Sequence, residues 1–208
     1  MPALPWLLSL LLPVLSAAPS AGTPEALFEQ AVQDGTLFES ETAQRFQQGG
    51  WGRDYYRLVK ERWKGQRPRG LTLELRPIPN GYSVGQSFDA GASLNNGGPA
   101  VSPLLDTGGD CGMTHPLRIV VVEPDGRLIQ GVGGGAVGGP HCFCHPEQRR
   151  LEPGGSVELM TGFTSRGAVR WVLERAGDLL VVGSYSLFEA GVESRVYSAP
   201  LEVSVRER

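Results

Sequence analysis

The composition of this chain is that of an ordinary globular protein with no electrostatic preference for nucleic acid. Its 208 residues are 40% apolar and 20% charged, which suffices for one domain and an appendage. A formal net charge of -3 excludes a strongly basic chain, and nucleic acid is therefore not an expected partner. The 29 glycines and 16 prolines fall between apolar runs, which favours many short strands joined by turns.

The first residues predict a cleavable signal peptide. Residues 6–14 form an apolar run that is too short to cross a bilayer, and small residues follow it. Ser16 and Ala18 stand at the -3 and -1 positions of a cleavage site, although the usual Lys or Arg before the apolar run is missing. We expect residues 1–18 to be removed on export to the periplasm or the outside of the cell. No second apolar stretch is long enough for a transmembrane segment in the mature chain.

Helical patterns predict an α-helical leader over residues 19–66. Thr23 is suited to be an N-cap, Pro24 fits the first turn, and Gly35 is expected to end the first helix. Two more helical patterns cover residues 41–47 and 53–63. We expect the leader to pack four large side chains on the following domain, because exposing them would leave an adhesive patch: Leu27, Tyr56, Val59 and Trp63.

The pattern changes period after the polar, basic segment 64–70, which marks a domain boundary near residue 67. Residues 67–208 predict a mainly β domain, an antiparallel sandwich, because eight short strand patterns follow one another without intervening helices. Glu123-Pro124-Asp125-Gly126 is a tight turn that joins two of them as a hairpin. The expected strands cover residues 71–76, 87–94, 117–123, 127–130, 156–160, 168–173, 179–188 and 201–205.

Three phrases in this domain resemble those of bacterial secreted immunoglobulin-like domains. They are Asn95-Asn96-Gly97-Gly98-Pro99 after a strand, Leu151-Glu152-Pro153-Gly154-Gly155-Ser156-Val157 before a strand, and Tyr197-Ser198-Ala199-Pro200-Leu201-Glu202-Val203 near the end. The resemblance covers about residues 71–205. It implies an immunoglobulin-like β-sandwich, a fold used for adhesion, scaffolding or ligand presentation, and a fold alone does not fix a function.

One pattern predicts catalysis. Leu104-Leu105-Asp106-Thr107-Gly108 resembles the active-site strand and turn of aspartic peptidases, in which two aspartates share a proton and activate water. The glycine-rich segment 131–139 could be a flap, and Val181-Val182-Gly183 resembles a later element of that family. The chain departs from the family at Gly109, where a small Ala or Ser is usual, and Asp106 alone would need a homodimer. The alternative is an ordinary turn, since Asp and Gly are common turn residues.

All three cysteines and all three histidines lie in two short segments. Cys111 and His115 precede the predicted hairpin, and His141, Cys142, Cys144 and His145 follow it. Because a hairpin returns on itself, we expect the two segments to meet at one end of the sandwich. An oxidising compartment then favours a disulfide between Cys111 and either Cys142 or Cys144.

A metal site is the alternative for the same residues. Cys111, His115, Cys142 and Cys144 would supply three thiolates and one imidazole, a set that suits tetrahedral zinc or, with Met113 nearby, Cu(I). The sequence as a whole favours an exported, non-catalytic binding or scaffolding module without a cofactor, whose partner is a protein or a cell-surface ligand. A copper- or zinc-binding protein and a homodimeric aspartic peptidase are the alternatives.

Overall fold

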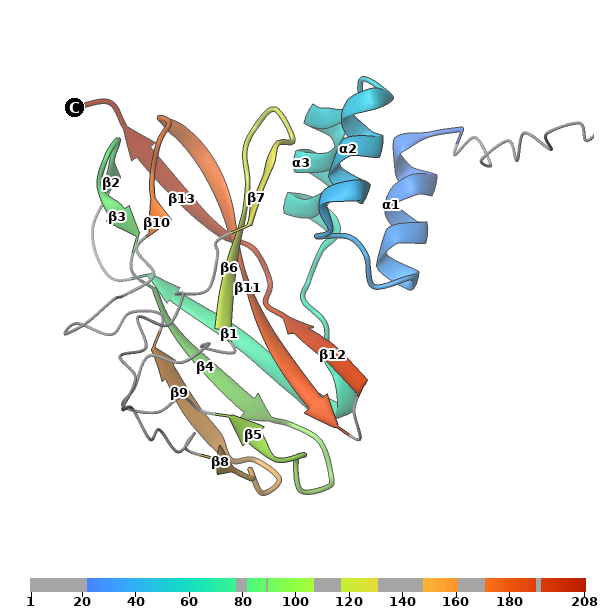
Figure 1. The fold of residues 1–208 in the computed structure, drawn as a ribbon, viewed down its shortest axis with the longest axis vertical. Coiled ribbons are helices and arrows are strands. Elements are labelled where there is room, and N and C mark those ends of the chain that lie inside the picture. Colours follow the sequence, from blue (N-terminus) through green and yellow to red (C-terminus); the bar gives the residue numbers. More distant parts are fainter. Residues whose placement is uncertain are drawn as a thin grey trace, which may run out of the picture.

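A computed structural model describes residues 22–77, 82–88, 90–106, 117–130, 148–160, 171–189 and 192–208. It gives a mostly β protein with three helices near its N-terminal end (Figure 1). The predicted signal peptide lies outside the described residues. Among the helices that the structure describes, none is long and apolar enough to cross a bilayer.

The helices are α1 (Pro24–Gln33), α2 (Ser40–Gln48) and α3 (Gly52–Arg62). Thr23 is the N-cap of α1, as the sequence predicts, because its Oγ1 accepts a hydrogen bond from the Ala26 amide at 3.2 Å. Gly35 follows the end of α1 at a φ of +70°, a left-handed conformation that glycine adopts without strain. A short 3₁₀ turn, η1 (Pro68–Gly70), leads from the helices into the first strand.

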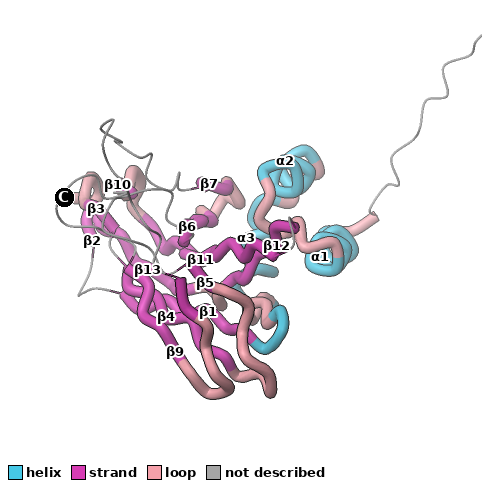
Figure 2. The backbone as a smooth tube through the Cα atoms, turned by 60° about the horizontal axis from the view of Figure 1, so that its bottom comes forward, coloured by secondary structure: helices cyan, strands magenta, loops and turns pink. Residues whose placement is uncertain are grey.

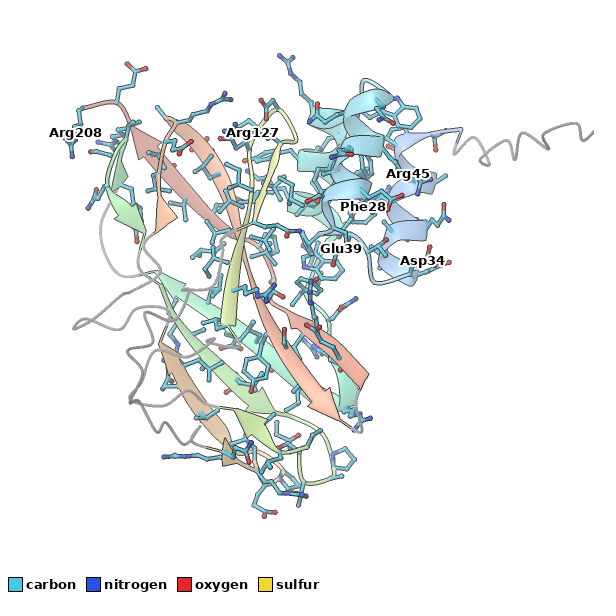
Figure 3. All side chains as sticks on the ribbon, in the orientation of Figure 1. Phe28, Asp34, Glu39, Arg45, Arg127 and Arg208 are labelled. Carbon is cyan, nitrogen blue, oxygen red and sulfur yellow. The ribbon has the colours of Figure 1, made fainter. Side chains whose placement is uncertain are left out.

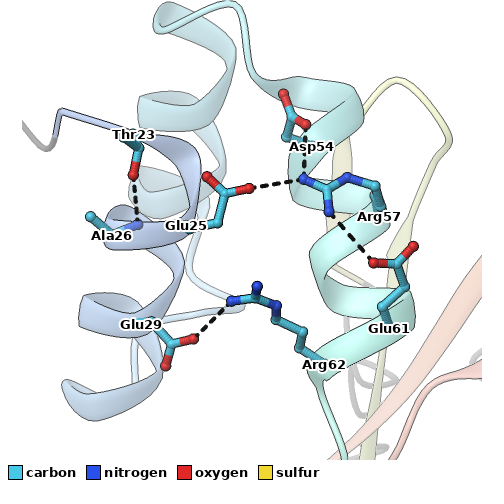
Figure 4. A network of polar contacts seen from close by, with 8 residues as sticks. All are labelled: Thr23, Glu25, Ala26, Glu29, Asp54, Arg57, Glu61 and Arg62. Atoms are coloured by element: carbon cyan, nitrogen blue, oxygen red, sulfur yellow. Dashed lines mark hydrogen bonds and ion pairs between the residues drawn. The ribbon is translucent and has the colours of Figure 1, made fainter.

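Ion pairs on the exposed side of the helices join α1 to α3 (Figure 4). Arg57 of α3 contacts Glu25 of α1 at 3.0 Å and Asp54 of its own helix at 3.1 Å. Arg62 reaches Glu29 at 3.2 Å. These side chains are about half exposed, so each pair adds little stability and the set mainly fixes how α1 lies along α3.

The strands form a larger and a smaller sheet with two short two-stranded ladders. The larger sheet has the order β2-β13-β11-β6-β7, with β12 also paired to β11, and the smaller one has the order β1-β4-β9. The bounds are β1 (Leu71–Pro77), β2 (Tyr82–Ser83), β3 (Ser87–Phe88), β4 (Ala90–Asn96), β5 (Leu105–Asp106), β6 (Leu117–Val122), β7 (Leu128–Gln130), β8 (Gln148–Arg149), β9 (Ser156–Met160), β10 (Trp171–Val172), β11 (Gly177–Glu189), β12 (Val192–Tyr197) and β13 (Leu201–Arg206).

The two sheets pack face to face as a β-sandwich-like body. Leu73 of β1, Leu94 of β4 and Tyr185 of β11 share one buried cluster between them. Gly183 in β11 allows the close approach, since a Cβ there would lie 3.0 Å or less from the Leu73 and Leu75 methyl groups. A second cluster fills the other end of the sandwich with Val121, Leu173, Leu179, Val181, Val203 and Val205.

The helices cover the opposite face of the larger sheet (Figure 2). Leu27, Val59 and Trp63 are almost fully buried there, and the half-buried Tyr56 donates a hydrogen bond from its hydroxyl to the Asp178 carbonyl at 2.8 Å. The prediction that these side chains pack on the β domain is confirmed for Tyr56 and Trp63, which bond main-chain carbonyls of that domain, while Leu27 and Val59 belong to the buried cluster that the helices share with it. Their cluster includes the sheet residues Val120, Val122, Leu180, Val182 and Tyr197.

The structure corrects one sequence prediction about the strands. The pairing is not wholly antiparallel, since β2 runs parallel to β13. The pattern predicted over 87–94 falls on β3 and β4, on either side of residue 89, which lies outside the described residues; β3 pairs with β10, whereas β4 pairs with β1 and β9. Asp106 ends strand β5, which pairs with β8. Long-range pairing decides these partners, and a local pattern does not record it.

Candidate functional site

The residues that the sequence singles out for metal binding or a disulfide lie outside the described residues. These are Cys111 and His115 in segment 107–116 and Cys142 and Cys144 in segment 131–147. No group of three potential metal ligands occurs within the part of the chain that the structure describes. The disulfide and the metal site therefore stay predictions.

The described strands nevertheless fix the positions of the residues that flank both segments. Asp106 at the end of β5 pairs with Gln148 at the start of β8, so the two segments share one pair of neighbouring ends. At their other ends, β6 and β7 pair as a hairpin in which Val120 lies opposite Gln130. Cys111 comes five residues after Asp106 and Cys144 four residues before Gln148. Both cysteines are thus within the reach of an extended chain from one point.

The peptidase motif is only partly described. The backbone of Asp106 belongs to β5, whereas Thr107, Gly108 and the glycine-rich segment 131–139 lie outside the described residues. Gly183 of the third motif element has the packing role given above, in the middle of the longest strand. The catalytic interpretation of Asp106 stays a prediction.

A different surface is well defined, at the end of the sandwich where β4 finishes. Asn96, the last residue of β4, is 1% exposed. Its side-chain amide bonds both the loop that follows β4 and the distant Leu151. The amide Nδ2 donates to the carbonyls of Ala100 at 2.8 Å and Leu151 at 2.9 Å, and Oδ1 accepts from the Gly98 amide at 3.0 Å. The β4–β5 loop is therefore fixed from within by a satisfied buried side chain.

Ser102 fixes the second half of the same loop. Its amide donates to the Leu151 carbonyl at 2.9 Å, and its Oγ accepts from the Leu151 amide at 2.8 Å. Because Ser102 is buried, its neighbours on the loop are turned outward. Val101 and Leu104 are each 45% exposed and are the large apolar side chains found exposed among the described residues.

A third piece of chain packs against this loop. Gly97 donates its amide to the Gly70 carbonyl at 3.0 Å, and a Cβ on Gly70 would come within 2.4 Å of the Gly98 Cα. Gly154 in turn donates to the Asn96 carbonyl at 2.7 Å. We refer to these three joined segments as the loop end: residues 67–70, 97–104 and 150–155.

The charged side chains of the loop end are mostly basic. Arg67, Arg69 and Arg150 are exposed there, and Arg149 lies next to Arg150 at the end of β8. Glu152 is the one acidic residue in these three segments. Sequence reasoning missed this surface, although the closely spaced Pro99 and Pro103 are a signal of a loop.

The charged residues of the β6–β7 turn serve the fold. The Glu123 carboxylate is nearly buried in the β6–β7 turn and is paired by Arg127, whose Nη2 donates at 2.9 Å and whose Nε makes a second bond. The hydrogen bond to Glu123 raises the pKa of Arg127. The predicted hairpin is confirmed, because β6 pairs with β7 and the Gly126 amide closes the turn by donating a hydrogen bond to the Glu123 carbonyl at 2.8 Å.

Comparisons with known proteins give no family. No protein-family model matches the chain, and no curated protein sequence matches it significantly. Northeast Structural Genomics Consortium target SoR45, an X-ray structure, is 14% identical with a TM-score of 0.37, and the match covers 65% of this chain and 87% of that one. The human CEP192 PapD-like domain 7 is 13% identical with a TM-score of 0.28, covering 71% and 92%. At these scores neither likeness carries an argument about this chain.

Proposed function

We propose that this chain is an exported, non-catalytic binding or scaffolding module built on an immunoglobulin-like β-sandwich, and that the loop end is its binding surface. The observation that carries the proposal is the pair of exposed aliphatic side chains, Val101 and Leu104, on a loop fixed by Asn96 and Ser102. A loop that is already fixed loses little further conformational entropy on binding, and exposed apolar side chains gain free energy when a partner removes them from water.

The position of the helices supports the same surface. They already cover one face of the larger sheet, and the second face is buried against the smaller sheet. The loop end lies at one end of the sandwich (Figure 1), and its side chains Arg67, Val101, Leu104 and Arg150 are exposed, whereas Leu151 is buried in the cluster between the sheets. A partner can therefore reach it without disturbing either core.

Site-specific photo-crosslinking tests the binding surface. The purified mature protein would carry a photoreactive residue at Leu104, or at the exposed Arg206 of β13 as a control, and would be incubated with cells of the source organism. We expect adducts from position 104 that decrease when Val101 is also changed to Ser. Equal labelling from both positions would contradict the proposal.

Export has its own test. Intact-mass measurement of the protein recovered outside the cytoplasm should give a chain that begins between residues 17 and 22, because small residues follow an apolar run of signal length. A recovered chain that still begins at Met1 would show that no signal peptide is removed.

The Cys/His segments offer a second candidate function, a copper- or zinc-binding protein. The pairing of Asp106 with Gln148 supports a site shared by the two segments, since both depart from one point, as a metal site or a disulfide requires. The competing proposal is the disulfide, which would close a loop of about thirty residues and contribute ~3–4 kcal/mol. Mapping of non-reduced peptides decides between them. A cross-link from Cys111 to Cys142 or Cys144 supports the disulfide, whereas three free thiols with one bound metal ion support the metal site.

A further inference from the structure

We propose that the loop end docks on an anionic bilayer surface, with its arginines at the lipid headgroups and Val101 and Leu104 in the outer part of the acyl region. The inference rests on the proposed function, because it names the partner of the same surface. It goes further in committing to a lipid surface rather than a protein.

The three segments of the loop end behave as one rigid surface. Main-chain hydrogen bonds join Gly97 to Gly70 and Gly154 to Asn96, and the Asn96 side chain ties the middle segment to Leu151. Figure 1 shows the β4–β5 loop and the β8–β9 turn at an extremity of the molecule, and Figure 3 shows Arg208 at the other end. An extremity of this kind can meet a flat surface with all three loops at once.

The charge of this extremity is opposite to that of the chain. The whole sequence carries -3, yet Arg67 and Arg150 are exposed in the loop end and have no ion-pair partner among the residues that the structure describes. Arg150 lies close to the β4–β5 loop that carries Val101 and Leu104, because both of its chain neighbours are joined to that loop or to the start of β5. Arg149 pairs with Leu105, and Leu151 is hydrogen-bonded to Ser102. Anionic headgroups attract arginines so placed, and the attraction weakens as salt screens it.

The types of apolar residue on this surface favour a bilayer over a protein as its partner. The exposed side chains at the tip are the aliphatic Val101 and Leu104, at 45% exposure each. Valine and leucine are under-represented among the residues that dominate protein–protein binding, where tryptophan and tyrosine prevail with arginine. Aliphatic side chains beside cationic ones are instead typical of surfaces that insert shallowly into a lipid interface.

Vesicle co-sedimentation of the mature protein tests the proposal. We would compare vesicles of phosphatidylcholine alone with vesicles that also contain phosphatidylglycerol, at low and raised salt. We expect binding only to the anionic vesicles, and weaker binding at raised salt. The double variant R67Q/R150Q should lower the partition coefficient on the order of ten- to thirty-fold. The variant V101S/L104S should lower it severalfold at both salt concentrations.

A matched control separates the surface from net charge. R206Q/R208Q removes two exposed arginines, Arg208 at the other end of the molecule (Figure 3) and Arg206 two residues before it at the end of β13, and changes the net charge equally. It should bind as the unchanged protein does. An equal loss in both double variants would overturn the proposal, because binding would then follow overall charge. All four residues are exposed, so an unchanged thermal midpoint shows that each variant is folded.

The photo-crosslinking experiment separates this inference from the proposed function. Absence of vesicle binding together with protein adducts from position 104 overturns the bilayer inference and leaves the binding module standing. Absence of both overturns both.

Discussion

The indole Nε1 of Trp63 donates a hydrogen bond to the main-chain carbonyl of Ser198 at 2.8 Å. Ser198 lies between β12 and β13 and pairs with Gly183 of β11, because its amide donates to the Gly183 carbonyl at 2.9 Å and its Oγ accepts from the Gly183 amide at 2.9 Å. The Gln66 amide also donates to the Tyr197 carbonyl at 2.9 Å. The helices are therefore attached to the sheet at the interruption of a strand.

Trp63→Phe should destabilise the protein by about 1–3 kcal/mol, because the buried Ser198 carbonyl loses its donor while most of the aromatic packing remains. The ring of Trp63 packs edge-on against Phe38 at 5.2 Å between centroids, which phenylalanine can largely retain. Urea unfolding measures the change. Trp51→Phe, at a half-buried indole, is the control and should cost less; equal losses would remove the special role of the Ser198 bond.

Gly126→Ala should destabilise more than Gly35→Ala. Both glycines have a positive φ, +81° and +70°, and alanine is strained at either. A Cβ at Gly126 would also lie 2.2 Å from the Gly52 carbonyl oxygen, where the β6–β7 turn contacts the start of α3, whereas nothing lies within 4 Å at Gly35. We expect about 1 kcal/mol at Gly35 and an additional 1–3 kcal/mol at Gly126. Equal free energies of unfolding would contradict the close contact between turn and helix.

Stability should fall at alkaline pH because of Tyr55. Burial raises the pKa of Tyr55, whose hydroxyl donates to the Leu37 carbonyl at 2.8 Å. A raised folded-state pKa means that the neutral phenol is favoured in the folded protein. Its contribution is full below the unfolded pKa of about 10 and is lost progressively as the pH rises above that value.

Two measurements at increasing pH check this prediction: the phenolate absorbance of the folded protein and its free energy of unfolding. Tyr55→Phe should cost about 1–3 kcal/mol at neutral pH, because the Leu37 carbonyl loses its donor, and should make the alkaline loss of stability shallower. An equally steep loss in Tyr55→Phe would show that other groups cause it.

Asn96→Ala should loosen the loop end. The change removes three hydrogen bonds: the buried Gly98 amide loses its acceptor, and the carbonyls of the exposed Ala100 and of Leu151, which Ser102 also bonds, each lose a donor. We expect a loss of about 2–4 kcal/mol and faster amide hydrogen exchange over residues 97–105. The half-exposed Asn95 on the same strand is the matched control, and Asn95→Ala should leave exchange in that loop unchanged. Similar exchange in both variants would contradict the role of Asn96.

Elements with local signals could be predicted from the sequence. The start of α1 follows from Thr23 and Pro24, and β9 covers the predicted residues 156–160. The β6–β7 turn follows from Pro124, Asp125 and Gly126. Strand β12 was missed because Glu193 and Arg195 interrupt its apolar residues, and the ion pair of Arg195 with Glu39 that helps to hold it comes from a distant part of the chain.

The sequence by itself determined that helices precede a β domain and where most turns fall, because capping, alternation and turn residues act over a few neighbours. Tertiary structure alone decided which strands pair and which face the helices cover. It also decided the loop end, because the partners of Asn96 lie at Ala100 and at the distant Leu151. A side-chain amide can donate to water or to any nearby carbonyl. It fixes the loop only when folding excludes water and brings the carbonyls of Ala100 and Leu151 within its reach.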